Sequence, residues 1–209
     1  MDNVQNLPYR GWMPCASDAA SGEAGTLRLI DPRHPRRESL EDFIRHRFMR
    51  AYGASPERLA ESLYAEEDED GQWVAAVGVR AASGERLYLE QYLDRDIERE
   101  IDIRLGRRLS RAEIVEVGNF AAVRTGHARH LISRLPLLLY CLGYRWVSFI
   151  ATRGLVNSFR RLGLEPIELA SADPLRLPDG GQRWGSYYRH APMVMVGEIR
   201  HGLNLPVRP

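Results

Sequence analysis

The chain has 209 residues, enough for one domain with a buried core or at most two small ones. Its 29 basic and 28 acidic side chains leave a net charge of +1, so charge gives no argument for a nucleic-acid partner. No apolar run reaches the roughly 18 residues that span a bilayer, and the start lacks a secretory pattern. Two cysteines make no disulfide framework, which favours a reduced, cytoplasmic setting, and Cys141 is expected in the core.

The chain opens with a segment that has no structural period. Residues 1–25 are rich in Gly, Ala, Ser and Asp, which predicts a flexible extension before a single domain at 26–209. Alternation over 26–30 predicts a strand, and apolar spacing over 36–52 predicts a helix. A weaker helix is expected from Ser55.

The next part of the sequence resembles a β-meander. Residues 66–70 form an acidic run that is expected to be a solvated turn. Residues 72–79 and 86–90 are predicted as two antiparallel strands, and the charged stretch 94–105 as a helix.

Two consecutive strand–helix units follow. Residues 112–123 predict a long apolar strand before a helix at 126–142, and residues 145–152 a strand before a short helix that ends at Gly163. The closing strands are expected at 167–170 and 193–199. This order predicts an α/β (α+β) fold with a mixed sheet and helices on both faces.

The junction after residues 113–123 is the first candidate site. A helix start presents unpaired N–H groups, and Gly126 and Ala128 allow a ligand to approach its backbone. Such a turn suits a pyrophosphate, to which Arg124 and Arg129 can add charge-assisted bonds. The turn alone leaves open the alternative that a helix simply begins after a strand.

Two segments resemble motifs of the GNAT acyltransferase superfamily. Residues 123–128 resemble its acyl-CoA-binding turn, Gln/Arg-x-x-Gly-x-Gly/Ala, except for valine at the first position. Residues 152–164 resemble its segment Asn-x-x-Ala-x-x-Leu-Tyr-x-x-Leu-Gly-Phe. Phe159 stands where the family often has a general-acid tyrosine, so that role does not carry over. Thr152 lies near the motif position at which the family has asparagine, whereas Asn157 lies several residues away from that position.

The resemblance implies a GNAT-like, mostly antiparallel sheet whose one parallel strand pair splays apart. In that family the pantetheine arm of the donor pairs with backbone at the splay, here between the strands of Glu116 and Phe149. The donor-binding residues are then expected to be Val117, Phe120, Ala121, Arg124, Gly126, Ala128, Arg129, Thr152 and Asn157.

Two further resemblances concern the same strand and the whole chain. Residues 116–120 resemble the Glu-x-x-Arg-Phe string of acyl-homoserine-lactone synthases, with Asn119 in place of arginine. Residues 27–200 resemble the bacterial thermostable hemolysin family. The strings that carry this resemblance are 89–94, 115–121, 160–164, 172–174 and 184–188. The family name records haemolysis and defines no reaction.

Three residues are the catalytic candidates. Glu90 and Glu116 lie in predicted buried strands, where an unpaired carboxylate is costly. Each is either a general base that deprotonates an amine or half of a structural ion pair. Asn119 either binds the thioester carbonyl or satisfies a buried backbone group.

A long loop near the end supplies the candidate substrate pocket. Trp184, Tyr187 and Tyr188 either wall a pocket for the acyl group or acceptor, or pack beneath the loop. His127 and His130 share a helix face without a third ligand, so no metal site is expected.

These interpretations predict an enzyme that transfers an acyl group from an acyl thioester to an amine or similar acceptor. The donor is a cosubstrate, acyl-CoA or an acyl carrier protein thioester, and no permanently bound cofactor is expected. The partners are a small-molecule acceptor and, where it serves as donor, a carrier protein; homodimer formation stays open. The alternatives are a membrane-active haemolytic protein and a catalytically inactive thioester-binding module.

Overall fold

The computed structural model describes residues 26–203, so the extension expected at 1–25 and residues 204–209 lie outside the described part. The helices are α1 (Arg37–Tyr52), α2 (Ile97–Leu105), α3 (Thr125–Cys141) and α4 (Arg153–Arg161). The strands are β1 (Arg28–Ile30), β2 (Ser62–Glu67), β3 (Trp73–Ala81), β4 (Ile114–Ala122), β5 (Trp146–Ala151), β6 (Ile167–Ser171) and β7 (Met193–Glu198). Short 3₁₀ helices connect several of them.

The strands form one seven-stranded sheet in the order β1-β2-β3-β4-β5-β7-β6. Every neighbouring pair is antiparallel except β4 and β5, which are parallel. A parallel pair needs a crossover connection, and α3 provides it. The predicted mixed, mostly antiparallel sheet is thereby confirmed.

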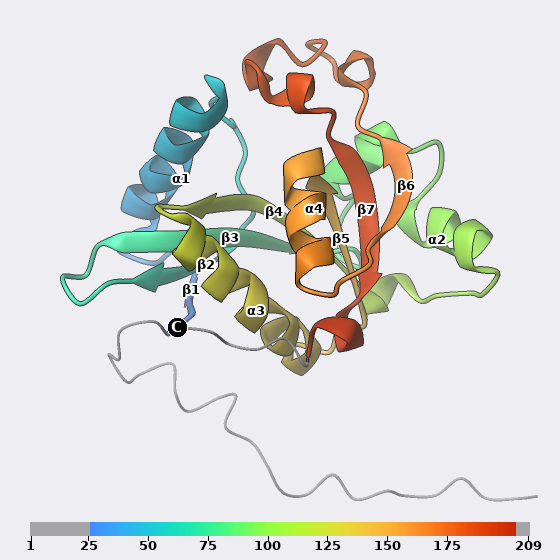
Figure 1. Ribbon diagram of the computed structural model, residues 1–209, viewed down its shortest axis with the longest axis horizontal. Helices are drawn as coiled ribbons and strands as arrows, with labels where there is room; N and C mark the ends of the chain where they lie inside the picture. The colour runs from blue at the N-terminus through green and yellow to red at the C-terminus, as the bar shows by residue number, and fades with distance from the viewer. Residues whose placement is uncertain (1–25, 204–209) are drawn as a thin grey trace, which may run out of the picture.

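Helices cover both faces of the sheet, as predicted (Figure 1). Side chains alternate along β2, so Leu63 and Ala65 pack in the cluster under α1, whereas Tyr64 packs in the cluster under α3. The α2 cluster lies on the α1 face of the sheet, and α4 packs on the α3 face against β5 and β7. α1 and α2 cover opposite ends of one face of the sheet, so neither helix covers the centre of that face (Figure 1).

The segment after α1 was predicted correctly only at its end. No helix forms from Ser55, and strand β2 takes in Glu66 and Glu67 of the expected acidic turn, whereas residues 68–70 are exposed in a turn as predicted. Glu66 is 1% exposed, and its carboxylate faces His130 (3.3 Å) and Arg134 (3.4 Å) on α3. Both partners come from a distant part of the chain. The acidic run by itself gave no sign of them and therefore indicated solvent exposure.

The strand predicted at 86–90 is also wrong, because this segment leads into a 3₁₀ helix, Tyr88–Tyr92. Leu87 and Leu89 are both buried in the α2 cluster, and the Glu90 carboxylate accepts the N–H of Leu87 at 2.7 Å within this turn. Cys141 is exposed rather than in the core, because it ends α3 away from the face that carries Leu139.

No helix within residues 26–203 is both long and apolar enough to span a membrane. The same described residues hold no group of three or more His, Cys, Asp or Glu side chains suited to a metal ion.

Candidate functional site

The parallel strands β4 and β5 separate halfway along their length. They pair from Ile114 opposite Trp146 to Val117 opposite Phe149. β4 then continues to Ala122 and β5 to Ala151 with no further pairing between them. Backbone polar groups that face each other across this splay are therefore available to a ligand.

A β-bulge in β4 accompanies the splay. The register of β3 and β4 shifts between the pair Gly78–Gly118 and the pair Ala76–Ala121, so β4 carries one extra residue there. Asn119, in the bulge, has φ of 51°, a left-handed conformation that asparagine tolerates better than most residues.

Asn119 also anchors the neighbouring segment. Its Oδ1 accepts the N–H of Ala60 at 2.9 Å, which is the backbone-satisfying role considered from the sequence. Gly78 makes this contact possible, because a Cβ there would lie 2.6 Å from that Oδ1 and 2.8 Å from the Ala60 Cβ. Three parts of the chain thus pack together at one point: the bulge in β4, strand β3, and the segment that precedes β2.

Replacing Gly78 with alanine is expected to lower the free energy of unfolding by about 1–3 kcal/mol, because the added methyl overpacks the bulge. Gly118→Ala is the matched control, since a Cβ at that neighbouring pocket residue meets nothing within 4 Å. Urea denaturation of both variants measures the difference. Equal losses would contradict the interlocked bulge.

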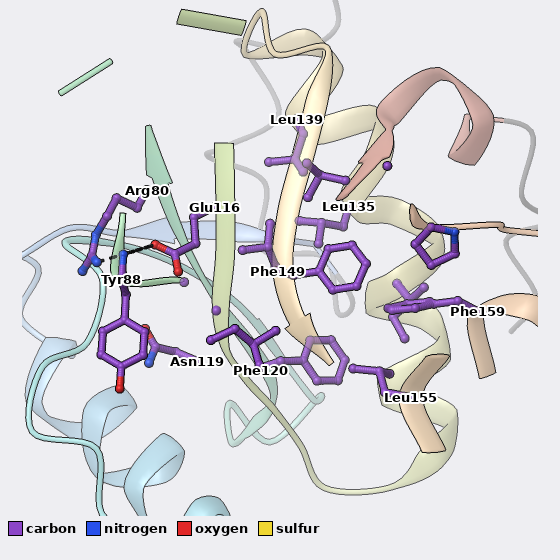
Figure 2. A pocket seen from close by; sticks show the side chains of 18 of the residues that line it. Arg80, Tyr88, Glu116, Asn119, Phe120, Leu135, Leu139, Phe149, Leu155 and Phe159 are labelled. Atoms are coloured by element: carbon purple, nitrogen blue, oxygen red, sulfur yellow. Dashed lines mark hydrogen bonds and ion pairs between the residues drawn. The ribbon is translucent and has the colours of Figure 1, made fainter. Parts of the chain in front are cut away.

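A pocket of about 440 Å³ opens at the splay and has walls on both faces of the sheet. Its volume falls in the range of roughly 300–1,000 Å³ usual for small-molecule sites. On the α1 and α2 face, its polar half is lined by Phe48, Tyr52, Arg58, Arg80, Tyr88, Glu116, Asn119, Trp184 and Tyr187. On the α3 and α4 face, its apolar half is lined by residues that include Ile132, Leu135, Leu139, Phe149, Leu155 and Phe159. Figure 2 shows the two halves on opposite sides of β4.

Glu116 is the buried carboxylate of the polar half, with 6% of its surface exposed. It accepts N–H groups from Tyr88 (2.8 Å) and Leu89 (2.9 Å), and Arg80 Nη1 lies 3.6 Å from its Oε2 (Figure 2). Burial outweighs these contacts and raises the pKa of Glu116 above the usual glutamate value. A carboxylate with a raised pKa inside a pocket is suited to accept a proton near neutral pH.

Glu90 lies outside the pocket lining and has an ion-pair partner. It is 1% exposed, and its carboxylate accepts Arg111 Nη1 at 2.6 Å and the N–H groups of Leu87 and Ile97. Burial alone would raise the pKa of Glu90, but these hydrogen bonds together hold it below the usual value. The carboxylate therefore fixes the turn that presents the Tyr88 N–H to the pocket.

Aromatic side chains from the late loop close the polar half. Trp184 and Tyr187 line the pocket, whereas Tyr188 lies behind them with its hydroxyl 2.6 Å from that of Tyr92. Tyr52, from α1, meets Tyr187 edge-on at 5.1 Å between ring centroids. The loop thus forms part of the wall and packs as well, which combines both roles considered from the sequence.

A close backbone contact holds this loop against the end of α1. The N–H of Ser186 donates to the Tyr52 carbonyl oxygen at 2.8 Å. Gly185 precedes it with φ of 53°, and a Cβ there would lie 2.1 Å from the same oxygen. Only glycine permits this approach.

The start of α3 lies beside the splay, because the helix begins three residues after β4 ends. Gly126, Arg124 and Arg129 are exposed there, and a Cβ on Gly126 would meet nothing within 4 Å. The space next to Gly126 at the start of α3 is therefore not filled by other described residues.

The structure brings together about half of the residues expected in the site. Those that line the pocket are Glu116, Val117, Asn119, Phe120, Thr152, Trp184 and Tyr187. Those outside its lining are Glu90, Ala121, Arg124, Gly126, Ala128, Arg129, Asn157 and Tyr188. Ala121 lies instead in the buried cluster under α1.

Sequence reasoning missed Arg58, Arg80 and Tyr88 in the polar half, and also the lining residues Glu165, Glu198 and His201. Arg80 pairs directly opposite Glu116 in the register of β3 and β4, so opposite charges at that position were the available signal. Arg58 lay in a segment expected to be helical, and Tyr88 in an expected strand. Neither gave a signal of its own.

A mostly antiparallel sheet, one parallel pair splayed at a bulge and a helix that starts beside the splay define the GNAT-type acyltransferase fold. The chain belongs to the thermostable hemolysin family, whose model matches residues 30–203. The predicted family and fold are thereby confirmed. A search of the curated proteins finds no match.

Solved structures share this fold at low sequence identity. FeeM, an N-acyl amino acid synthase from uncultured soil microbes, has a TM-score of 0.58 at 10% identity, over 87% of this chain and 94% of that chain. BjaI, a CoA-dependent acyl-homoserine lactone synthase solved with SAM and isopentyl-CoA, has 0.56 at 16%, over 85% of each chain. MesI, another CoA-dependent acyl-homoserine lactone synthase, has 0.53 at 17%, over 86% and 92%. At such identities the likeness establishes the fold alone.

Proposed function

We propose that this protein is an enzyme that transfers an acyl group from an acyl thioester to the nitrogen of an amine or a similar nucleophile. The observation that carries the proposal is the pocket that joins an apolar half to a buried carboxylate through the splay of β4 and β5. Coenzyme A and acyl carrier proteins present the same pantetheine arm, so both remain donors in this proposal. The kinds of enzyme named among the similar folds agree with it.

The donor would lie in the splay with its acyl chain in the apolar half. Amides of a pantetheine arm can pair with unpaired strand backbone, as an added strand does. β4 beyond Val117 and β5 beyond Phe149 offer such backbone. The exposed start of α3 at Gly126, flanked by Arg124 and Arg129, suits the phosphates of the donor.

The reaction would take place where the polar and apolar halves meet. Glu116 would accept the proton of the acceptor amine as its nitrogen attacks the thioester carbon. The tetrahedral intermediate then expels the thiolate, and Asn119 or free N–H groups of the splay would bind the oxyanion. A thiol with a pKa of about 8.5 leaves without a strong general acid, so Phe159 at the usual tyrosine position is compatible with turnover.

The membrane-active alternative gains no support from α3, the apolar helix that would have to reach the lipid. Its apolar face, with Leu131, Leu135 and Leu139, is buried against the sheet. Dye release from liposomes by the purified protein is a separate test of that activity.

Thiol release from acyl-CoA substrates tests the proposal. The protein is incubated with a series from butanoyl- to hexadecanoyl-CoA and a panel of amines, and N-acyl products are identified by mass spectrometry. We expect amine-dependent thiol release above the rate without amine. Thioester binding without turnover would favour the inactive module, and thermal-shift titrations without any stabilisation by acyl-CoA or acyl-carrier thioesters would contradict the donor site.

A further inference from the structure

We infer that the acceptor is an amine that also carries a carboxylate and an apolar or aromatic body, as an aromatic α-amino acid does. This inference rests on the proposed function and names the substrate class of its polar half. It is drawn from the charges and aromatic rings that line that half.

Two of the three charged groups in the polar half already have partners. Arg80 Nε lies 3.0 Å from Glu85 Oε1, and Arg80 Nη1 lies 3.6 Å from Glu116 Oε2. Glu116 also accepts two backbone N–H groups. The charges of Arg80 and Glu116 therefore largely neutralise each other and do not call for a charged group on the ligand. Glu116 would still take a proton from the acceptor.

Arg58 supplies the remaining charge. Its side chain lines the pocket and is exposed, and within residues 26–203 it has neither an ion pair nor a hydrogen bond to the protein. The preceding Glu57 pairs with Arg183 instead. A guanidinium binds a planar carboxylate with two parallel hydrogen bonds, so Arg58 fits an acidic group on the acceptor.

The backbone that carries Arg58 is held in place. Ala60, two residues further on, donates its N–H to Asn119 Oδ1 at 2.9 Å, inside the bulge beside Glu116. Arg58 is thus tied to the splay through one short segment and does not depend on a free loop. A cation whose backbone is anchored on one wall and a proton acceptor on another can orient a molecule that has both an acid and an amine.

Aromatic rings line the same half of the pocket as these charges. Tyr52 meets Tyr187 at 5.1 Å, Trp184 meets Tyr187 at 5.5 Å, and Phe48 meets Trp184 at 6.1 Å between centroids. Such a wall takes an apolar or aromatic body. A polyamine, whose additional cations would face Arg58, fits this half poorly.

The step balances in atoms and charge. The amine nitrogen forms a bond to the thioester carbon, the carbon–sulfur bond breaks, and the displaced proton passes to Glu116. The acceptor carboxylate stays ionised beside Arg58 and takes no part in bond making. Glu116 then returns this proton to the departing thiolate, so the products are an N-acyl amino acid and the free thiol, and the carboxylate is regenerated.

Matched acceptors test the inference with one acyl-CoA. Phenylalanine is compared with phenylalaninamide and phenethylamine, which keep the ring and amine but lack the carboxylate; the other protein amino acids and hydroxylamine complete the panel. We expect kcat/KM for phenylalanine or another apolar or aromatic amino acid to exceed that of its carboxylate-free counterpart about 10- to 100-fold. Arg58→Ala should abolish this preference mainly through KM, and Arg58→Lys should restore part of it. Arg33 is exposed and outside the pocket lining, so Arg33→Ala should leave kcat/KM unchanged both for phenylalanine and for its carboxylate-free counterparts.

The outcomes separate this inference from the proposed function. Equal kcat/KM with and without the carboxylate overturns the inference and leaves acyl transfer intact. The same holds if Arg58→Ala lowers kcat/KM equally for every acceptor, or if hydroxylamine is acylated and no amino acid is acylated. Absence of thiol release with every acceptor, hydroxylamine included, overturns both, because hydroxylamine needs neither Arg58 nor the aromatic wall.

Discussion

Replacing Glu116 with glutamine is expected to lower kcat/KM for acyl transfer about 10²- to 10⁴-fold, the usual contribution of a general base. Glutamine has a similar shape but cannot take the proton from the acceptor. Thioester binding should persist, because the donor would occupy the splay and the apolar half. Steady-state kinetics and a thermal-shift titration measure the two effects separately.

The pH profile gives this prediction a second readout. Only the ionised carboxylate accepts a proton, so kcat/KM should rise with pH through the pKa of Glu116. Burial raises that pKa, which places the acidic limb of the profile above the ordinary glutamate value. The limb should disappear in Glu116→Gln and persist in Glu168→Gln, a control at an exposed position of β6. Full activity in Glu116→Gln would contradict the mechanism.

Replacing Arg111 with alanine is expected to lower the free energy of unfolding by about 3–5 kcal/mol, because it leaves a buried carboxylate without its partner. Arg111 donates to Glu90, which is 1% exposed, and also reaches Glu98 at 2.6 Å and the Ala82 carbonyl oxygen at 2.7 Å. Urea denaturation at neutral pH measures the loss.

Arg95→Ala is the matched control for this variant. Arg95 pairs with Glu100 at 3.2 Å, but 54% of the Arg95 side chain is exposed, so the pair should contribute under about 1 kcal/mol. Equal losses in both variants would contradict the structural role of Arg111.

The pH dependence of stability follows from the same ion pair. The folded-state pKa of Glu90 lies below the usual glutamate value. The stabilisation by ionised Glu90 is therefore complete above the unfolded pKa and is lost as pH falls through the folded pKa. We expect Arg111→Ala to weaken this acid dependence, measured as the free energy of unfolding across the acidic range.

The strand–helix order of the second half was predictable because its local patterns agree with its tertiary surroundings. The apolar run predicted at 112–123 forms β4, and the amphipathic pattern predicted at 126–142 forms α3, with boundaries that shift by one or two residues. Long periodic segments of this kind are the most dependable sequence signals. The strand predicted at 145–152 forms β5, which pairs in parallel with β4 as far as the splay.

The errors occur where a polar residue is buried by a distant partner. Glu66 suggested a solvated turn, yet His130 and Arg134 bury it within a strand. Glu90 suggested a strand end, yet Arg111 fixes it in a 3₁₀ turn. Periodicity carries no information about such pairings, which depend on how α3 and the segment before β4 pack.

The site divides in the same way. Glu116 and Asn119 were predictable because they lie in the strand that the motifs identify. Arg80 follows only from the register of β3 and β4, and Arg58 only from the Asn119 contact that holds its segment beside the bulge. Sequence motifs thus located the strand, whereas tertiary contacts assembled the polar half around it.

A crystal structure of the protein with a thioether analogue of an acyl-CoA tests the central claim most directly. The account predicts the pantetheine arm between β4 beyond Val117 and β5 beyond Phe149, with the acyl chain toward Leu135 and Leu139 and the sulfur on the side of Glu116. An analogue bound elsewhere, with the two strands hydrogen-bonded to each other along their whole length, would contradict it.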